Sequence, residues 1–219
     1  MHPILRDTYR ALPFLQSAYR ATRRVVSRQQ VKWQVRQCIR NGSPLKIVIG
    51  ANRKFQSGWI PTEEYNLNLL SDQDWARYFQ PASVTRMVSE HVWEHLTAEQ
   101  GLIAARLCFH HLKSGGCLRV AVPDALFPSK EYRDYCKPGG HGPSAWDHKM
   151  FFDYRSMSEL FRLAGFSVTP LEWYDETGVF HITPWELEDG QIKRSTKFPD
   201  PKRFDGLPYT SLILDAVKP

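Results

Sequence analysis

Short apolar segments alternate with segments of helical spacing along most of the chain. The apolar segments are rich in β-branched residues, as buried strands are; they cover residues 46–51, 84–89, 117–122, 166–174 and 209–217, with a further extended stretch at 59–64. Apolar residues at helical spacing predict helices over residues 71–79, 98–112 and 156–164. This alternation predicts an α/β fold with a Rossmann-like, mostly parallel sheet. Because no helix separates the last two strands, we expect the C-terminal strand to be antiparallel.

A separate helical pattern precedes the first strand. It begins near Pro13, which suits a first helical turn, and ends at Asn41-Gly42. Its apolar positions at helical spacing include Phe14, Ala18, Ala21, Val25 and Val26. We interpret residues 1–43 as a helical extension and residues 44–219 as the main domain.

The positive charge of the chain is concentrated in this extension. The net charge is +6, but residues 1–40 hold eight Arg and one Lys against one acidic residue, and the remaining chain carries −2. A nucleic-acid binder usually carries its basic surface on the fold that reads the nucleic acid, so we do not expect a nucleic-acid partner. Two interpretations of residues 13–40 stay open. The helix could pack its apolar side on the domain and expose its arginines, or it could touch anionic lipid or an acidic partner.

The sequence has no apolar stretch of 18 residues and no apolar leader at its N-terminus. Four dispersed cysteines give no disulfide pattern: Cys38, Cys108, Cys117 and Cys136. We expect a cytoplasmic protein with reduced thiols, and a peripheral position at the inner membrane if the basic helix touches lipid. The oligomeric state is left open.

Candidate chemistry follows from the fold prediction. In open α/β sheets, ligands bind at the carboxyl ends of the strands, where connections diverge. Four segments directly follow predicted strands: Gly50-Ala51-Asn52, Glu63-Glu64, Ser89–His95 and Pro123-Asp124. We expect these segments to meet at one edge of the sheet.

Several segments together resemble the class I S-adenosylmethionine-dependent methyltransferases. The similarity is to a small bacterial subgroup often associated with surface-glycan biosynthesis. The matching segments are IGA (49–51), GWIPTEE (58–64), SVTRMVSEHVWEHL (83–96), HLKSGGCLRVAVPD (111–124), PGGHGP (138–143), DHKMFFDYRSMSELFRLAGF (147–166) and YTSLILDAVKP (209–219). The resemblance implies a methyltransferase that uses S-adenosylmethionine as its cofactor.

One of these segments also contains a zinc-peptidase pattern. His91, Glu94 and His95 spell H-x-x-E-H. A peptidase would carry both histidines on a long helix, whereas His91 is expected at a strand-to-helix turn. We therefore favour no metal here. Glu94 and His95 would instead cap the following helix and brace the turn.

The resemblance assigns cofactor roles to the strand ends. Gly50 would let the backbone approach the amino-acid end of the cofactor, and the N–H groups of Ala51 and Asn52 would hold its carboxylate. A strand-end carboxylate would accept the ribose hydroxyls, with Glu63 as first choice and Glu64 as second. The remaining cofactor contacts would lie under the methionine portion, at Ser89, Glu90 and His91.

The glycine motif departs from the usual family pattern. Gly-x-Gly-x-Gly is reduced to Gly50-Ala51-Asn52, and only residues 52–59 separate the first two strands. A crossover that contains a helix needs about 10–12 residues. We therefore expect the first crossover helix to be shortened or missing, which puts cofactor binding itself in question.

A hydroxyl acceptor would need a base to remove its proton. Histidine titrates near neutral pH, so His148 is our choice, with Asp147 or Asp124 as its orienting partner. The expected reaction is methyl transfer to an oxygen of a small molecule or glycan precursor. The alternatives are a non-catalytic binding protein on the same fold and, less favoured, an RNA methyltransferase.

Overall fold

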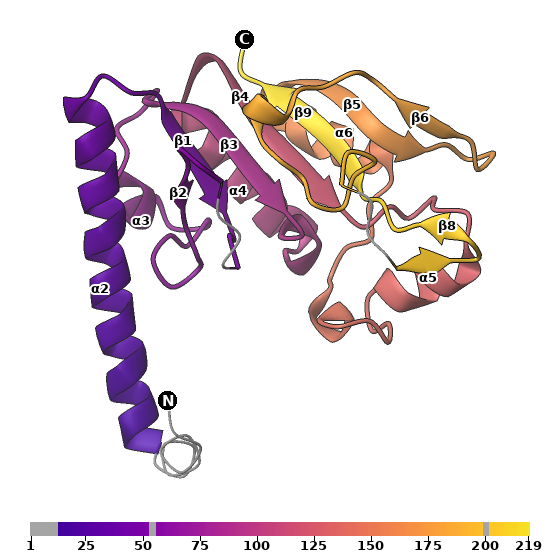
Figure 1. The fold of residues 1–219 in the computed structure, drawn as a ribbon, viewed down its shortest axis with the longest axis horizontal. Coiled ribbons are helices and arrows are strands. Elements are labelled where there is room, and N and C mark those ends of the chain that lie inside the picture. The colour runs from indigo at the N-terminus through magenta and orange to yellow at the C-terminus, as the bar shows by residue number, and fades with distance from the viewer. Residues whose placement is uncertain (1–12, 53–55, 199–201) are drawn as a thin grey trace.

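A seven-stranded mixed sheet forms the centre of the protein (Figure 1). The computed structural model describes residues 13–52, 56–198 and 202–219. In sheet order the strands are β2 (Ile60–Pro61), β1 (Leu45–Ile49), β3 (Val84–Glu90), β4 (Leu112–Val122), β9 (Leu212–Val217), β5 (Ser167–Tyr174) and β6 (Phe180–Ile182). β2, β1, β3 and β4 are parallel, whereas β9 is antiparallel to both of its neighbours, β4 and β5. The predicted α/β fold and antiparallel C-terminal strand are therefore confirmed.

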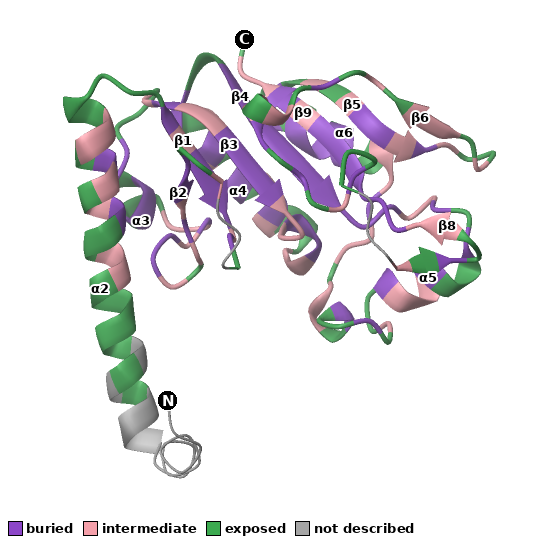
Figure 2. Cartoon of the chain, viewed as in Figure 1, coloured by how far each residue is buried: buried purple, intermediate pink, exposed green. Residues whose placement is uncertain are grey.

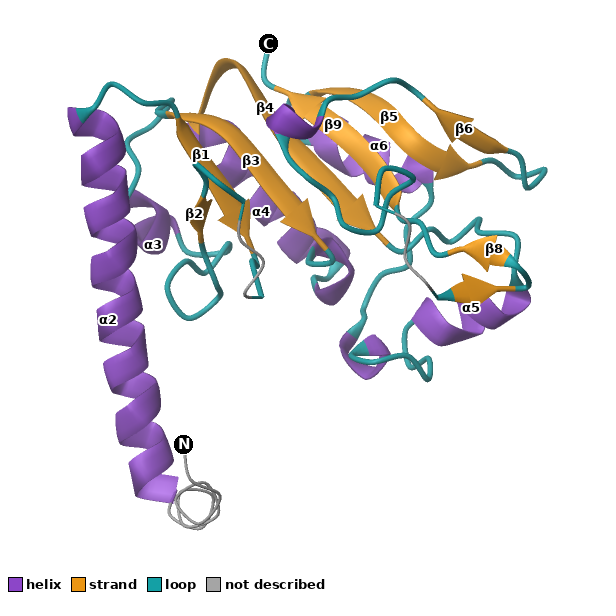
Figure 3. Ribbon diagram, viewed as in Figure 1, coloured by secondary structure: helices purple, strands orange, loops and turns teal. Residues whose placement is uncertain are grey.

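Three helices cover one face of this sheet (Figure 3). They are α3 (Asp72–Ala76), α4 (Ala98–His111) and α6 (Tyr154–Leu163). Ser71 caps α3 as the sequence indicates, but α4 is capped by Thr97, so Glu94 and His95 do not cap it as we expected. Thr97 and Gln100 form a reciprocal capping box there, which satisfies the first free backbone N–H groups of the helix.

The opposite face is covered mainly by irregular chain instead of helices. The connection between β6 and β9 returns across this face and includes a 3-10 turn, Leu187–Asp189. It buries Trp185 and Ile192 against Val48, Val88 and other sheet residues. Because this connection is polar and lacks a period, its covering role was not visible in the sequence.

The connection from β1 to β2 contains no helix among its described residues, 50–52 and 56–59. For these residues, this agrees with the expectation that the first crossover helix is shortened or missing. Instead, a long helix, α2 (Pro13–Arg40), lies beside the β2 edge of the sheet (Figure 1). No helix in the described part of the chain is long and apolar enough to cross a membrane.

The described residues of α2 that are buried lie in its second half (Figure 2), and in its first half Arg23 lies over the ring of Tyr65, 4.9 Å from the ring centre. In the second half Val31 and Val35 are buried, and Asn66 donates a hydrogen bond to Ser27 (2.7 Å). Val25 and Val26 are exposed, so the first of the two open interpretations, an apolar side packed on the domain, does not describe this part of the helix. The side chain of Phe14 lies outside the described residues, as does that of Ala18.

The stretch 125–149 shows no period in the sequence, yet it contains regular structure. It contains α5 (Lys130–Cys136) and a 3-10 turn (Ala145–Asp147). A two-stranded ribbon, β7 (Arg203–Phe204) with β8 (Leu207–Pro208), packs beside α5 around a separate aromatic cluster. Short helices flanked by Pro and Gly leave too few turns for a periodic signal. The cluster fixes the loop that carries Asp147 and His148.

Candidate functional site

The candidate site lies where the order of the parallel strands reverses. β1 has β2 on one side and β3 on the other, so the connections from β1 and β3 leave the sheet in different directions. Such a switch point forms a crevice at the carboxyl ends of the strands. Ile49 pairs with Ser89, and the amide of Ala51 donates to the carbonyl of Thr62 (2.9 Å). The segments after β1, β2 and β3, three of the four expected to meet at one edge, therefore do meet there.

A hollow of about 450 Å³ opens at this crevice, on the side of the helices. Small-molecule sites typically occupy about 300–1,000 Å³. Its lining includes three of the predicted cofactor residues, Gly50, Glu64 and His91. The other lining residues are Ile49, Leu67, Asn68, Leu69, Leu70, Val92, His95, Leu96, Gln100, Asp147 and Lys149. The hollow thus combines an apolar wall with a few charged groups.

Gly50 is required here by backbone conformation and by space. Its φ is +61°, and an added Cβ would lie 2.5 Å from Cγ2 of Val92. The missing side chain therefore makes room for Val92 as well as for any ligand. Loss of this glycine should disturb the junction of β1 and β3 even without a ligand.

Gly50→Ala is expected to lower the free energy of unfolding by about 1–3 kcal/mol, because it adds left-handed strain and a steric clash. In the double variant Gly50→Ala/Val92→Ala, the steric part of this effect should disappear and the conformational part should remain. Denaturant unfolding of both variants and of Val92→Ala measures the two parts. A single Gly50→Ala variant as stable as the unchanged protein would contradict this assignment.

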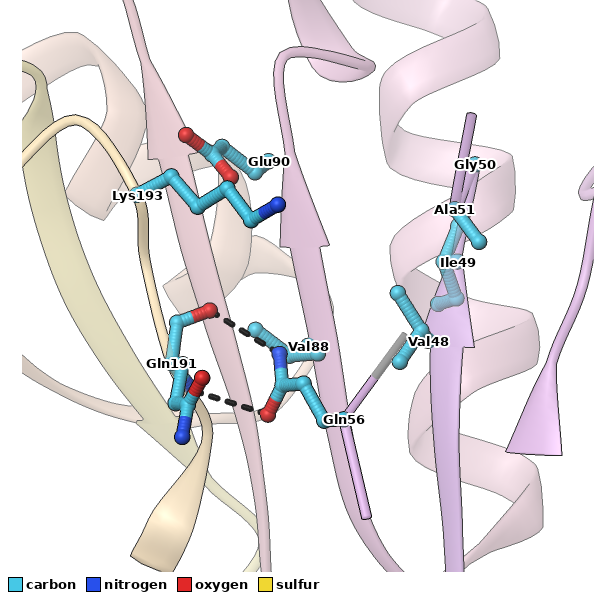
Figure 4. Close-up of a pocket in the computed structure, with 9 residues that line it drawn as sticks. All are labelled: Val48, Ile49, Gly50, Ala51, Gln56, Val88, Glu90, Gln191 and Lys193. Atoms are coloured by element: carbon cyan, nitrogen blue, oxygen red, sulfur yellow. Dashed lines mark hydrogen bonds between the residues drawn. The ribbon is translucent and has the colours of Figure 1, made fainter. Parts of the chain in front are cut away.

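A second hollow borders Gly50 on the other side of the sheet, but it is nearly closed (Figure 4). It holds about 20 Å³, enough for roughly one water molecule. Gln56 and Gln191 close it with two hydrogen bonds of 3.0 and 2.9 Å. Glu90 lines it and accepts from the amide of Arg194 (3.0 Å). This hollow is too small for an adenosyl group, so Glu90 does not lie where the predicted cofactor contact would need it.

The remaining predicted cofactor residues are also separated from the open hollow. Ser89 is fully buried in the sheet. Ala51 is buried and its N–H is already bonded to Thr62, so this amide does not hold a carboxylate as we expected. Asn52 is exposed with φ +42°, at the edge of the described chain.

Glu63 and Glu64 diverge at the end of β2. Glu64 lines the open hollow, whereas Glu63 lines a separate hollow of about 490 Å³ beside α2. The side-chain oxygen of Asn66 accepts from the amide of Glu63 (2.9 Å) and fixes this turn. The structure therefore favours Glu64, our second choice, as the carboxylate of the switch-point site.

Asp124 is placed for a structural role. It is 1% exposed, and its two oxygens accept from the amides of Leu126 (2.9 Å) and Tyr174 (2.8 Å). Burial raises its pKa to about 6, while the two amide hydrogen bonds oppose that rise. It lies outside the hollow and does not contact His148, so the structure gives no support for the predicted catalytic or orienting role.

His148 and Asp147 do not pair with each other as predicted; each has another partner. Nδ1 of His148 lies 2.6 Å from the carbonyl oxygen of Cys136, and Asp147 instead lies 3.2 Å from Nδ1 of His95. The rings of His95 and His148 meet edge to face, with centroids 4.8 Å apart. His95 lines the hollow, so it joins the candidate site. The sequence contained this residue in a recognised motif, but the pairing across 52 positions was not predictable.

The other two members of H-x-x-E-H lie behind this pair. Glu94 is 1% exposed, and burial raises its pKa to about 7. Its oxygen Oε1 lies 3.0 Å from Nδ1 of His91, without the alignment of a hydrogen bond. Nε2 of His91 lies 3.0 Å from the hydroxyl oxygen of Ser211. His91 also has φ +59°, which a residue with a side chain rarely adopts and which marks a constrained turn.

No protein-family model matches this chain, and no curated protein matches it. Solved structures with a similar arrangement include an S-adenosylmethionine-dependent methyltransferase from Thermotoga maritima, described as a possible histamine N-methyltransferase. It is 14% identical, with a TM-score of 0.47 over 93% of this chain and 97% of that one. A second such methyltransferase, from Archaeoglobus fulgidus, is 14% identical, with a TM-score of 0.46 over 87% and 94%. Similarity at this level assigns neither a family nor an activity.

Proposed function

We propose that this protein is an S-adenosylmethionine-dependent methyltransferase and that the open hollow at the switch point binds the cofactor. One observation carries the proposal. A ligand-sized hollow lies at the carboxyl ends of β1 and β3 and brings together Gly50, Glu64 and His91 from three chain segments. This is where open α/β sheets bind their ligands.

The lining of the hollow suits the parts of this cofactor. The exposed carboxylate of Glu64 can accept hydrogen bonds from both ribose hydroxyls. Leucines at 67, 69 and 70 give an apolar surface for adenine, and the ammonium of Lys149 can attract the cofactor carboxylate. When bound, the cofactor supplies an electrophilic methyl group on a sulfonium. The protein then mainly has to align the acceptor with that methyl group.

We further propose that the acceptor is an oxygen of a small molecule or glycan precursor. His95 faces the hollow, and Asp147 accepts the hydrogen bond from its Nδ1. The proton on Nδ1 leaves Nε2 free to accept the acceptor proton. This pair replaces the predicted pair of His148 and Asp147.

Titration calorimetry tests cofactor binding directly. The unchanged protein should bind S-adenosylmethionine at one site per chain, with Kd on the order of micromolar to sub-millimolar. Adenosine alone should bind more weakly, because it lacks the group that Lys149 attracts. If millimolar cofactor gives no heat of binding and no thermal stabilisation, the proposal is contradicted and the non-catalytic alternative is favoured.

We also propose that α2 holds the protein against anionic lipid. Opposite the buried side, the helix exposes both apolar residues and arginines; these are Val25, Val26, Trp33, Arg36 and Arg40. An apolar and basic helix surface of this kind suits the interface of an anionic membrane.

Arg36→Glu/Arg40→Glu is expected to weaken vesicle binding by roughly tenfold or more, at about 1 kcal/mol for each arginine lost near the surface. Arg106→Glu/Arg162→Glu is the matched control, because it makes the same charge change on the exposed surfaces of α4 and α6. Flotation with phosphatidylserine vesicles measures both. Equal losses in the two variants would leave no specific role for α2.

A further inference from the structure

Three side chains beside the hollow come together in a way that the proposed methyl transfer does not require. Glu94 and His95 lie on the 3-10 turn after β3 (Trp93–His95), and His148 lies on the loop after α5. Each of the three offers one atom that could bind a metal ion, and these three atoms lie within 4.8 Å of one another. The amides of Lys149 and Met150 donate to the carbonyl of Glu94 (2.7 and 3.1 Å). The backbone thus holds the loop against the turn.

Each histidine uses Nδ1 for a protein partner. The carbonyl oxygen of Cys136 can only accept, so Nδ1 of His148 carries the proton of that 2.6 Å hydrogen bond. The carboxylate of Asp147 likewise accepts from Nδ1 of His95. In both neutral rings Nε2 is then the nitrogen with a free lone pair. A carbonyl or carboxylate behind Nδ1 is the usual support of a metal-binding histidine.

The environment of the Glu94 carboxylate is a second, independent indication of a bound cation. Its carboxylate is almost completely buried, yet neither oxygen accepts a hydrogen bond from the described residues. A buried carboxylate without such partners is costly unless a cation balances it. His91 is the nearest basic group, and it also contacts Ser211. A divalent ion would satisfy Glu94 and both imidazoles together.

We propose that Glu94, His95 and His148 bind a divalent transition-metal ion, with Zn²⁺ as the best fit to two imidazoles and one carboxylate. Three protein ligands leave a coordination position open, as in catalytic rather than structural zinc sites. His95 lines the hollow, so a bound ion would lie beside it. The set differs from the H-x-x-E-H peptidase pattern, because His148 from a distant loop takes the place of His91.

This inference does not depend on the proposed methyl transfer. If both hold, His95 is a metal ligand in the loaded protein and no longer the proton acceptor. A hydroxyl bound to the cation would then lose its proton to solvent more readily, because the cation lowers its pKa.

The test is direct metal binding to the full chain after treatment with a chelator. Zn²⁺ titration should give one site per chain. Bound Co²⁺ should show visible d–d absorption, which should disappear when Zn²⁺ displaces the Co²⁺. Glu94→Gln, His95→Ala and His148→Ala should each weaken Zn²⁺ binding at least tenfold. His110→Ala is the matched control, because His110 is exposed on α4 and outside the set.

Folding of each variant is checked by circular dichroism and thermal unfolding in chelator. If Glu94→Gln fails to fold, the comparison of the unchanged protein with the His95→Ala variant still tests the inference, because the side chain of His95 is partly exposed. No Zn²⁺ or Co²⁺ binding by the unchanged protein would overturn the inference. Equal binding by the unchanged protein, His95→Ala and His148→Ala would overturn it as well.

Discussion

Glu64→Gln is expected to weaken S-adenosylmethionine binding about 10- to 100-fold, whereas Glu63→Gln should change it less than twofold. A hydrogen bond that involves a charged group contributes about 1.5–3 kcal/mol, and Glu64 lines the hollow in which we propose that it accepts the ribose hydroxyls. Glu63 faces the hollow beside α2. Calorimetry on the two variants and the unchanged protein measures the difference.

The two substitutions form a matched pair. They lie next to each other in the chain, remove the same charge and keep nearly the same side-chain volume. A general electrostatic effect would therefore appear in both variants. If Glu63→Gln were the more damaging, the cofactor would lie on the α2 side of β2, and our assignment of the site would be wrong.

Arg119→Ala is expected to lower the free energy of unfolding by about 3–5 kcal/mol. Arg119 is 1% exposed and makes two 2.8 Å hydrogen bonds to the carboxylate of Asp215. It also donates to the carbonyls of Glu186 (2.7 Å) and Gly190 (2.8 Å), and it lies over the Trp185 ring. Its loss would leave Asp215 without its partner and release the connection that covers the sheet.

Arg86→Ala is the control for this prediction. Arg86 lies on the adjacent strand β3 and pairs with Asp189 of the same connection, but both side chains are partly exposed. Such a pair contributes about 0–1 kcal/mol. Denaturant unfolding of the two variants should separate them clearly. Equal effects would mean that Arg119 does not anchor the connection as the geometry indicates.

The sequence predicted the parts of the fold that have a strong local signal. β1 ends in the apolar run Ile47–Ile49, β4 is buried throughout its predicted part, 117–122, and Ser71 with Asp74 marks the start of α3. Local signals also misled us in places. For α6, Ser156 and Glu159 have the spacing of a capping box in the sequence, but Asp153 is the N-cap and Ser156 its reciprocal partner. Ser156 is three positions after Asp153, and Glu159 is three positions after Ser156, so spacing could not decide between the two pairs.

The site depends on long-range contacts, and these were only partly predictable. The edge where Gly50 and Glu64 meet followed from strand order. The choice between Glu63 and Glu64 did not, because the direction of each side chain depends on the turn that Asn66 fixes. The pairing of Asp147 with His95 likewise depends on a loop that packs against the turn after β3.

The most direct test of the central claim is a crystal structure of the protein soaked with S-adenosylmethionine. The account predicts cofactor density in the open hollow, with the ribose at Glu64, adenine along Leu67–Leu70 and the sulfonium toward His95. Density in the hollow beside Glu63 and α2, or an empty switch-point hollow at saturating cofactor, would contradict it.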